Sequence, residues 1–169
     1  MIKKGVFLFL LCSIVFLSCE LLLPVKINFD TDTFNREWTA WEEQGIVNYT
    51  VWEGIGSPER VSGYITVRDN VIIGYDLPEV KWPGRSLLKT ISEIYAYVNQ
   101  RYEEAVERIE ADKGKIGGMR GIEIKVTYNK EFHFPEYVYI STSYYEGSVD
   151  GRLAYTFNLL EFTSLAPAE

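Results

Sequence analysis

The most specific chemistry in this chain is at Cys19, which directly follows Ser18 at the end of the uncharged segment from Gly5 to Ser18. Lys3 and Lys4 precede that segment. A basic start and an apolar run shorter than the roughly 20 residues of a spanning helix are typical of a secretory signal. A small residue before a cysteine is what a lipoprotein signal peptidase requires. We therefore expect cleavage before Cys19 and acylation of its thiol, with fatty-acyl chains such as palmitate.

An uncleaved N-terminal anchor is the alternative to this lipidation. Phe16 occupies the place where the usual bacterial lipobox has leucine, and the apolar run resumes at Leu21 to Leu23. A longer anchor would hold Glu20 near the membrane core, at a cost of a few kcal/mol. We therefore favour lipidation.

His133 is the only histidine, and Glu131 and Glu136 are close to it in the sequence. A histidine beside a carboxylate can transfer protons. The alternative is a turn histidine flanked by aromatic residues. Covalent catalysis also requires a nucleophile next to the base, and the sequence supplies none there. We therefore predict no catalytic residue and keep a small secreted hydrolase using His133 as the alternative.

Metal and cofactor sites are not predicted. One histidine cannot supply a typical catalytic zinc site. Asp30 and Asp32 begin like a calcium loop, but Phe34 occupies the next ligand position, which favours a capped helix start. The segment from Gly114 to Gly118 lacks the strand and helix that flank a phosphate-binding loop, which favours a flexible turn.

Tyrosine is abundant, with twelve in the chain, and Tyr137 and Tyr139 lie on one predicted strand. If Val138 and Ile140 face the core, the two tyrosines face the other side of the sheet. Tyrosine suits recognition because its ring is apolar and its tip is polar. The alternative is that tyrosine simply suits strands and covers the sheet against the first helix.

The charge balance excludes nucleic acid as a partner. The chain has 17 basic and 24 acidic side chains, and loss of Lys3 and Lys4 with the signal changes the net charge from −7 to −9. Phosphate backbones and anionic lipids repel such a protein, so membrane attachment must come from the acyl chains. Cys12 also leaves with the signal, and the mature domain then has no disulfide.

The periodicity predicts one α+β domain. Thr90 and Glu93 form a capping box at the start of the long helix, and Asp69-Asn70 suit a two-residue hairpin turn. Strands joined by short connections pair antiparallel, so we expect a single antiparallel sheet of about six strands, with the long helix on one face. The expected elements are a helix over Thr33 to Gln44, strands over Ile46 to Glu53, Val61 to Arg68 and Val71 to Leu77, a helix from Ile91 to near Asp112, and strands over Ile122 to Tyr128, Glu136 to Tyr145 and Leu153 to Phe162.

Through the order and spacing of several short motifs, the chain resembles a family of bacterial lipoprotein domains, the domain of unknown function numbered six-one-seven-four. The resemblance covers roughly Arg36 to Phe162. Members of that family often carry a Cys-x-Cys pair, which the segment from Trp52 to Gly56 lacks. The motifs are Trp41, Gly45, Asn48-Tyr49-Thr50, Ile65 to Asn70, Thr90 to Ile94, Val126-Thr127-Tyr128, Phe134-Pro135, Tyr155-Thr156-Phe157 and Glu161-Phe162. The resemblance implies a secreted or lipid-anchored domain without an assigned activity.

These inferences divide the chain into a signal peptide (1–18), a lipidated cysteine and tether (19–31) and one domain (32–164). We expect a non-enzymatic binding or interaction module of the bacterial cell envelope, lipid-anchored on the periplasmic or outer-surface side. Its partner would be an envelope protein or a small ligand. An inhibitor of a secreted enzyme is a further alternative.

Overall fold

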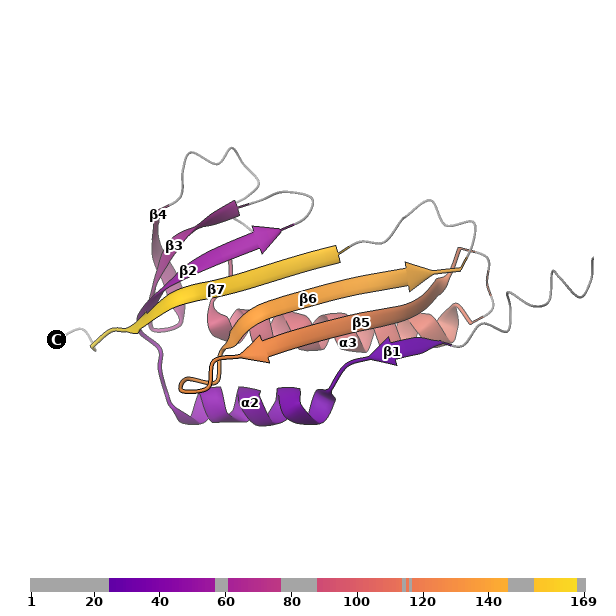
Figure 1. The fold of residues 1–169 in the computed structure, drawn as a ribbon, viewed down its shortest axis with the longest axis horizontal. Helices are drawn as coiled ribbons and strands as arrows, with labels where there is room; N and C mark the ends of the chain where they lie inside the picture. Colours follow the sequence, from indigo (N-terminus) through magenta and orange to yellow (C-terminus); the bar gives the residue numbers. More distant parts are fainter. Residues whose placement is uncertain are drawn as a thin grey trace, which may run out of the picture.

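The computed structural model describes residues 25–56, 61–76, 88–113, 115, 117–145 and 154–166. These residues form two layers, a twisted sheet and two helices that lie on one of its faces (Figure 1). The predicted signal peptide, Cys19 and the predicted loop from Pro78 to Ser86 lie outside the described residues. In the described part of the chain, no helix has the length and apolar character needed to cross a membrane.

The chain alternates strands and helices in the order β-α-βββ-α-βββ. The elements are β1 (Lys26–Asn28), α2 (Thr31–Glu43), β2 (Tyr49–Gly56), β3 (Val61–Arg68), β4 (Val71–Asp76), α3 (Ile91–Ala111), β5 (Met119–Tyr128), β6 (Pro135–Tyr144) and β7 (Ala154–Ser164).

The sheet has seven strands in the order β1-β5-β6-β7-β2-β3-β4. Two antiparallel three-stranded units, β2 to β4 and β5 to β7, join through the antiparallel pair of β2 and β7. The prediction of a purely antiparallel sheet of about six strands is wrong, because β1 adds a seventh strand parallel to β5. β1 lies within the segment expected to be a tether. The strand is not predicted from the sequence, because three residues are too few to show an alternating pattern.

The hairpin of β3 and β4 has the predicted turn. Asp69 and Asn70 have φ values of 50° and 60°, which match a turn with two left-handed residues. The turn pairs Val67 with Ile72. A bulge then shifts the register, so that Ile65 pairs with Tyr75.

Helix α2 begins two residues earlier than predicted. The carboxylate of Asp30 caps it by accepting a hydrogen bond from the Thr33 amide at 3.0 Å. That hydrogen bond lowers the pKa of Asp30. Gly45, with a φ of 62°, follows the helix and ends it.

Helix α3 has the predicted capping box. The Thr90 hydroxyl accepts from the Glu93 amide, and the Glu93 carboxylate accepts from the Thr90 amide. Its apolar stripe packs on the sheet, and Tyr95 joins the stripe by stacking on Trp38 of α2 and on Tyr128 of β5. The core therefore lies between the helices and one face of the sheet.

Candidate functional site

His133 lies in a tight loop between β5 and β6, as the turn interpretation predicts. Asn129 organises this loop, since its side-chain oxygen accepts from the amides of Glu131 and Phe132 at 3.0 and 2.9 Å. The backbone amide of His133 in turn donates to the Asn129 carbonyl at 2.9 Å. The loop thereby holds His133 at a φ of 60°, which non-glycine residues rarely adopt.

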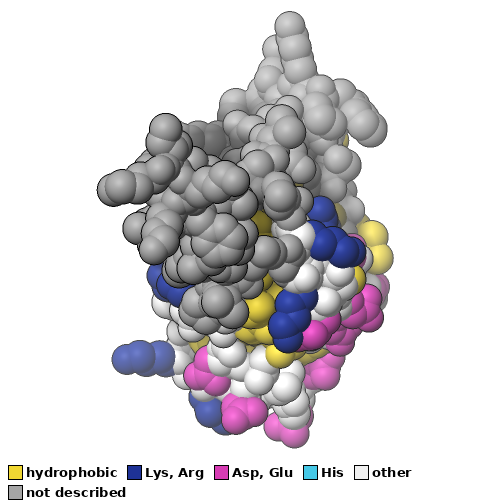
Figure 2. Space-filling view, turned by 90° about the vertical axis from the view of Figure 1, so that its right-hand side faces the viewer, with side chains coloured by type: hydrophobic (Ala, Val, Ile, Leu, Met, Phe, Trp, Pro, Cys, Tyr) yellow, Lys and Arg dark blue, Asp and Glu magenta, His cyan; other side chains and the backbone are white. Residues whose placement is uncertain are grey.

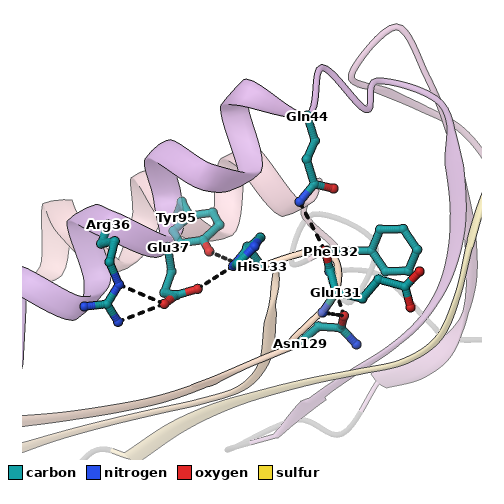
Figure 3. Close-up of polar contacts among 8 residues, drawn as sticks. All are labelled: Arg36, Glu37, Gln44, Tyr95, Asn129, Glu131, Phe132 and His133. Atoms are coloured by element: carbon teal, nitrogen blue, oxygen red, sulfur yellow. Dashed lines mark hydrogen bonds and ion pairs between the residues drawn. The ribbon is translucent and has the colours of Figure 1, made fainter.

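The imidazole of His133 points at helix α2 (Figure 3). Its Nδ1 lies 2.7 Å from Oε2 of Glu37, and Arg36 contacts the other oxygen of that carboxylate at 2.9 Å. The expected neighbours are not its partners. Glu136 accepts a hydrogen bond from Asn129 instead, and Glu131 offers its backbone carbonyl to Gln44 at 3.5 Å.

Tyr95 completes the polar cluster, since its hydroxyl donates to the backbone carbonyl of His133. Burial raises the pKa of Tyr95, and the Glu37 charge adds to that effect. Burial also acts to raise the pKa of Glu37, but hydrogen bonds from His133 and Arg36 outweigh it and lower this pKa. The carboxylate is therefore ionised and accepts from the imidazole.

This cluster joins the β5–β6 loop to both helices. Covalent catalysis by a histidine and carboxylate pair needs a nucleophile beside the ring. Among the described residues, no serine, threonine or cysteine side chain hydrogen-bonds to the His133 imidazole. The side chain of His133 is 36% exposed, and its hydrogen bonds tie the loop down. The contacts of His133 described here connect the loop to helix α2 and helix α3.

Glu53 is the most unusual titratable residue, because its side chain is fully buried on the core face of β2. One carboxyl oxygen accepts from the Lys89 amide at 3.4 Å, next to the start of α3, and the other has no hydrogen-bond partner among the described residues. Burial raises the pKa of Glu53 to about 8, and the nearby charge of Glu93 adds to that rise. Glu53 is thus protonated at neutral pH.

The second face of the sheet, which we call the open face, is not covered by either helix in Figure 1. Val138 and Ile140 are buried on the helix side, so Tyr137 and Tyr139 lie on the open face, as predicted from the alternation of β6. Both tyrosines are half-buried. Lys125 of β5 lies 5.7 Å from the ring centre of Tyr139.

Other aromatic and apolar side chains share the open face with the tyrosines. Trp52 of β2 is paired with Tyr64 of β3 and Leu160 of β7, which are 42% and 53% exposed. The hydroxyl of Tyr64 donates to Glu161. The indole of Trp52 lies over Gly54, where an added Cβ would come within 2.8 Å of the ring.

The sequence interpretation missed Glu37, Glu53 and Trp52. No local pattern links Glu37 to His133, which is 96 residues away. The alternation of β2 did contain a signal for the other two. Glu53 falls in phase with the buried Tyr49 and Val51, whereas Trp52 falls out of phase and thus on the open face.

The fold and these sites define a two-layer α/β domain with one helix-free sheet face. No group of three or more metal-ligating side chains occurs among the residues that the structure describes. Comparisons with family models, with curated proteins and with solved structures gave no match. The resemblance to the lipoprotein family of unknown function gains no support from them.

Proposed function

We propose that this chain is a membrane-anchored binding module of the bacterial cell envelope, and that the open face of its sheet is the binding surface. The observation that carries the proposal is that both helices cover the same face, which leaves Tyr137 and Tyr139 on the other. Their hydroxyls form no hydrogen bond with any described residue. Half-buried tyrosines whose hydroxyls have no partner among the described residues suit recognition better than structural support.

A capture experiment tests this function. Intact protein is purified from detergent-solubilised envelope together with its partners, and a Tyr137→Ala, Tyr139→Ala double variant is treated in the same way. The variant is expected to lose the partners that the parent retains. Ile73→Ala, at an exposed position on edge strand β4, is the matched control. Equal recovery with the double variant would contradict the proposed surface.

The proposed anchor is tested separately. Cys19→Ser removes the thiol that would carry the acyl chains. Because each buried methylene contributes about 0.8 kcal/mol, the variant is expected to leave the membrane fraction. A variant that sediments with membranes as the parent does would contradict lipidation.

The small hydrolase is the alternative function, and no observed contact favours it. His133 binds Glu37 through Nδ1, and its backbone carbonyl accepts from Tyr95. Any hydrolytic activity that His133→Asn abolished, in a variant that still folds, would revive this alternative. An inhibitory role likewise has no contact in its favour.

A further inference from the structure

The open face contains a small uncharged patch at its centre. Two rows of residues cross strands β6, β7 and β2 there, one through Tyr137, Asn158 and Gly54 and the next through Tyr139, Thr156 and Gly56. The Trp52 ring lies over Gly54 in the first row. The patch thus consists of Trp52, Gly54, Tyr137, Tyr139, Thr156 and Asn158.

The side chains of the patch combine aromatic surface with neutral hydrogen-bonding groups. Two phenol hydroxyls, the hydroxyl of Thr156 and the amide of Asn158 can each donate and accept. None of the four forms a hydrogen bond with any described residue. Flat aromatic surface beside unpaired hydroxyl and amide groups matches the two sides of a sugar ring, which has apolar C–H faces and a rim of hydroxyls.

The charge of the patch favours an uncharged ligand. The chain carries a net charge of −7, yet the patch has no ionisable acid or base other than its two tyrosines. Of the charged side chains described beside the patch, Lys125 is already paired with Glu123 at 2.9 Å, and the carboxylate of Glu161 accepts from the Tyr64 hydroxyl. Among the described residues, the cation and the carboxylate beside the patch therefore already have partners, which favours a ligand without charge.

The size of the patch favours a ligand smaller than a protein. Adjacent strands lie about 4.8 Å apart, so the distance from β6 to β2 is about 10 Å, and the two rows are about 7 Å apart. A stable protein interface buries about 800 Å² on each partner, far more than this area. One or two sugar rings fit these dimensions.

We infer that the patch binds a neutral carbohydrate chain, with a sugar ring on Trp52 and its hydroxyls bonded to Asn158 and the two tyrosines. This inference rests on the proposed binding function of the open face and names its ligand class. A protein partner or a second copy of the chain are the alternatives that the test separates.

Binding of neutral oligosaccharides tests the inference. The full chain, in a detergent without a sugar headgroup, is titrated with chitopentaose, cellopentaose and maltopentaose and applied to an array of neutral glycans. Calorimetry and tryptophan fluorescence report binding. At least one neutral glycan is expected to bind, and Trp52→Ala or Tyr137→Ala is expected to weaken it at least tenfold, while Ile73→Ala leaves it unchanged.

Gly54→Ala is the sharpest variant, because it deletes no contact group. The added methyl displaces the Trp52 ring, and binding is expected to weaken while the aromatic side chain is still present. Tyr137→Phe keeps the ring and removes one hydroxyl, so it is expected to weaken binding less than Tyr137→Ala. Circular dichroism of each variant verifies folding.

Three outcomes would overturn the inference. These are a failure of every neutral glycan to bind, an unchanged affinity in the Trp52, Gly54 and Tyr137 variants, and a dimer in analytical ultracentrifugation that these substitutions dissociate. If no glycan binds but the double tyrosine variant still loses a captured protein, the inference fails and the proposed binding function survives. If neither effect occurs, both fail.

Discussion

At the scale of single residues, two carboxyl groups sit in opposite electrostatic settings. Glu37 is held ionised by hydrogen bonds from His133 and Arg36, whereas burial keeps Glu53 protonated. As pH rises, ionisation of Glu37 therefore stabilises the fold, whereas ionisation of Glu53 destabilises it. Each setting leads to a measurable pH dependence.

Glu53→Gln is expected to make the fold more stable at alkaline pH. The pKa of Glu53 is about 8 in the folded chain, against an ordinary value of 4.5, so between these values the folded chain holds a proton that the unfolded chain releases. The free energy of unfolding therefore falls as pH rises through this range. Glutamine keeps the shape without a titrating proton, so we expect a gain of at least about 1 kcal/mol at pH 8 and little change at pH 4.

Urea unfolding at both pH values measures this effect. Tyr49, Lys89 and Glu93 are the titratable neighbours of Glu53 and are unchanged in the variant. Glu42→Gln, an exposed carboxyl on α2, is the matched control and should keep the parental slope. Parallel pH profiles for Glu53→Gln and the parent would contradict the prediction.

The pair of Glu37 and His133 is expected to couple energetically. A double-mutant cycle with Glu37→Gln and His133→Asn measures this coupling, and asparagine suits the positive φ of His133. We expect about 0.5–1 kcal/mol at pH 6, because the imidazole is partly exposed and solvent screens the pair. The lowered pKa of Glu37 implies that this stability is lost as pH falls below 4.5.

The same cycle with Glu131→Gln provides the control. Glu131 is close to His133 in sequence, but its carboxylate does not contact the imidazole in the described structure. A coupling with Glu131 equal to that with Glu37 would contradict the observed geometry.

At the scale of elements, the turn between β3 and β4 sets the position of the hairpin. Its tip is held to the start of β2, because the amide of Asn70 donates to the Val47 carbonyl and the amide of Asp69 donates to the Asn48 side chain, both at 3.0 Å. The conformation at Asn70 should therefore affect stability without changing any core contact.

Asn70→Ala is expected to destabilise the fold by about 1–2 kcal/mol, because alanine tolerates a φ of 60° poorly. Asn70→Gly keeps the backbone donor, removes the Cβ and should recover most of that loss. Thermal unfolding of both variants distinguishes turn strain from a lost side-chain contact. Equal melting temperatures for the alanine and glycine variants would exclude strain as the cause.

Elements that depend on local patterns could be predicted, and long-range ones could not. The capping box of α3 and the turn at Asp69 and Asn70 are encoded within four neighbouring residues, and both are confirmed. The parallel pairing of Lys26 with Gly121 joins segments about a hundred residues apart and has no local signal. For the same reason, Tyr137 and Tyr139 could be assigned to a face, but the partner of His133 could not be identified.

At the scale of the whole molecule, the start of β1 and the β5–β6 loop lie at opposite ends (Figure 1). β1 and the end of α3 lie at one end, and the loop with His133 lies at the other (Figure 1). Figure 2 shows that basic and acidic side chains are mixed at the end where β1 begins. Mixed charges give little attraction to anionic lipid, so acyl chains on Cys19 would have to hold the domain at the membrane.

The position of Cys19 predicts how the domain is oriented on the membrane. Five residues lie between Cys19 and Val25, the first described residue, and the connection spans at most about 20 Å. β5 then extends about 30 Å from its start near β1 toward the His133 loop. The proposed acylation would block Cys19, so that a single added cysteine could carry a fluorophore. A label at Lys113→Cys should be quenched by headgroup spin labels in vesicles, whereas a label at Glu131→Cys should not. Equal quenching at both positions would mean that the domain lies flat on the bilayer, and a glycan on the open face would then have to compete with lipid for Trp52.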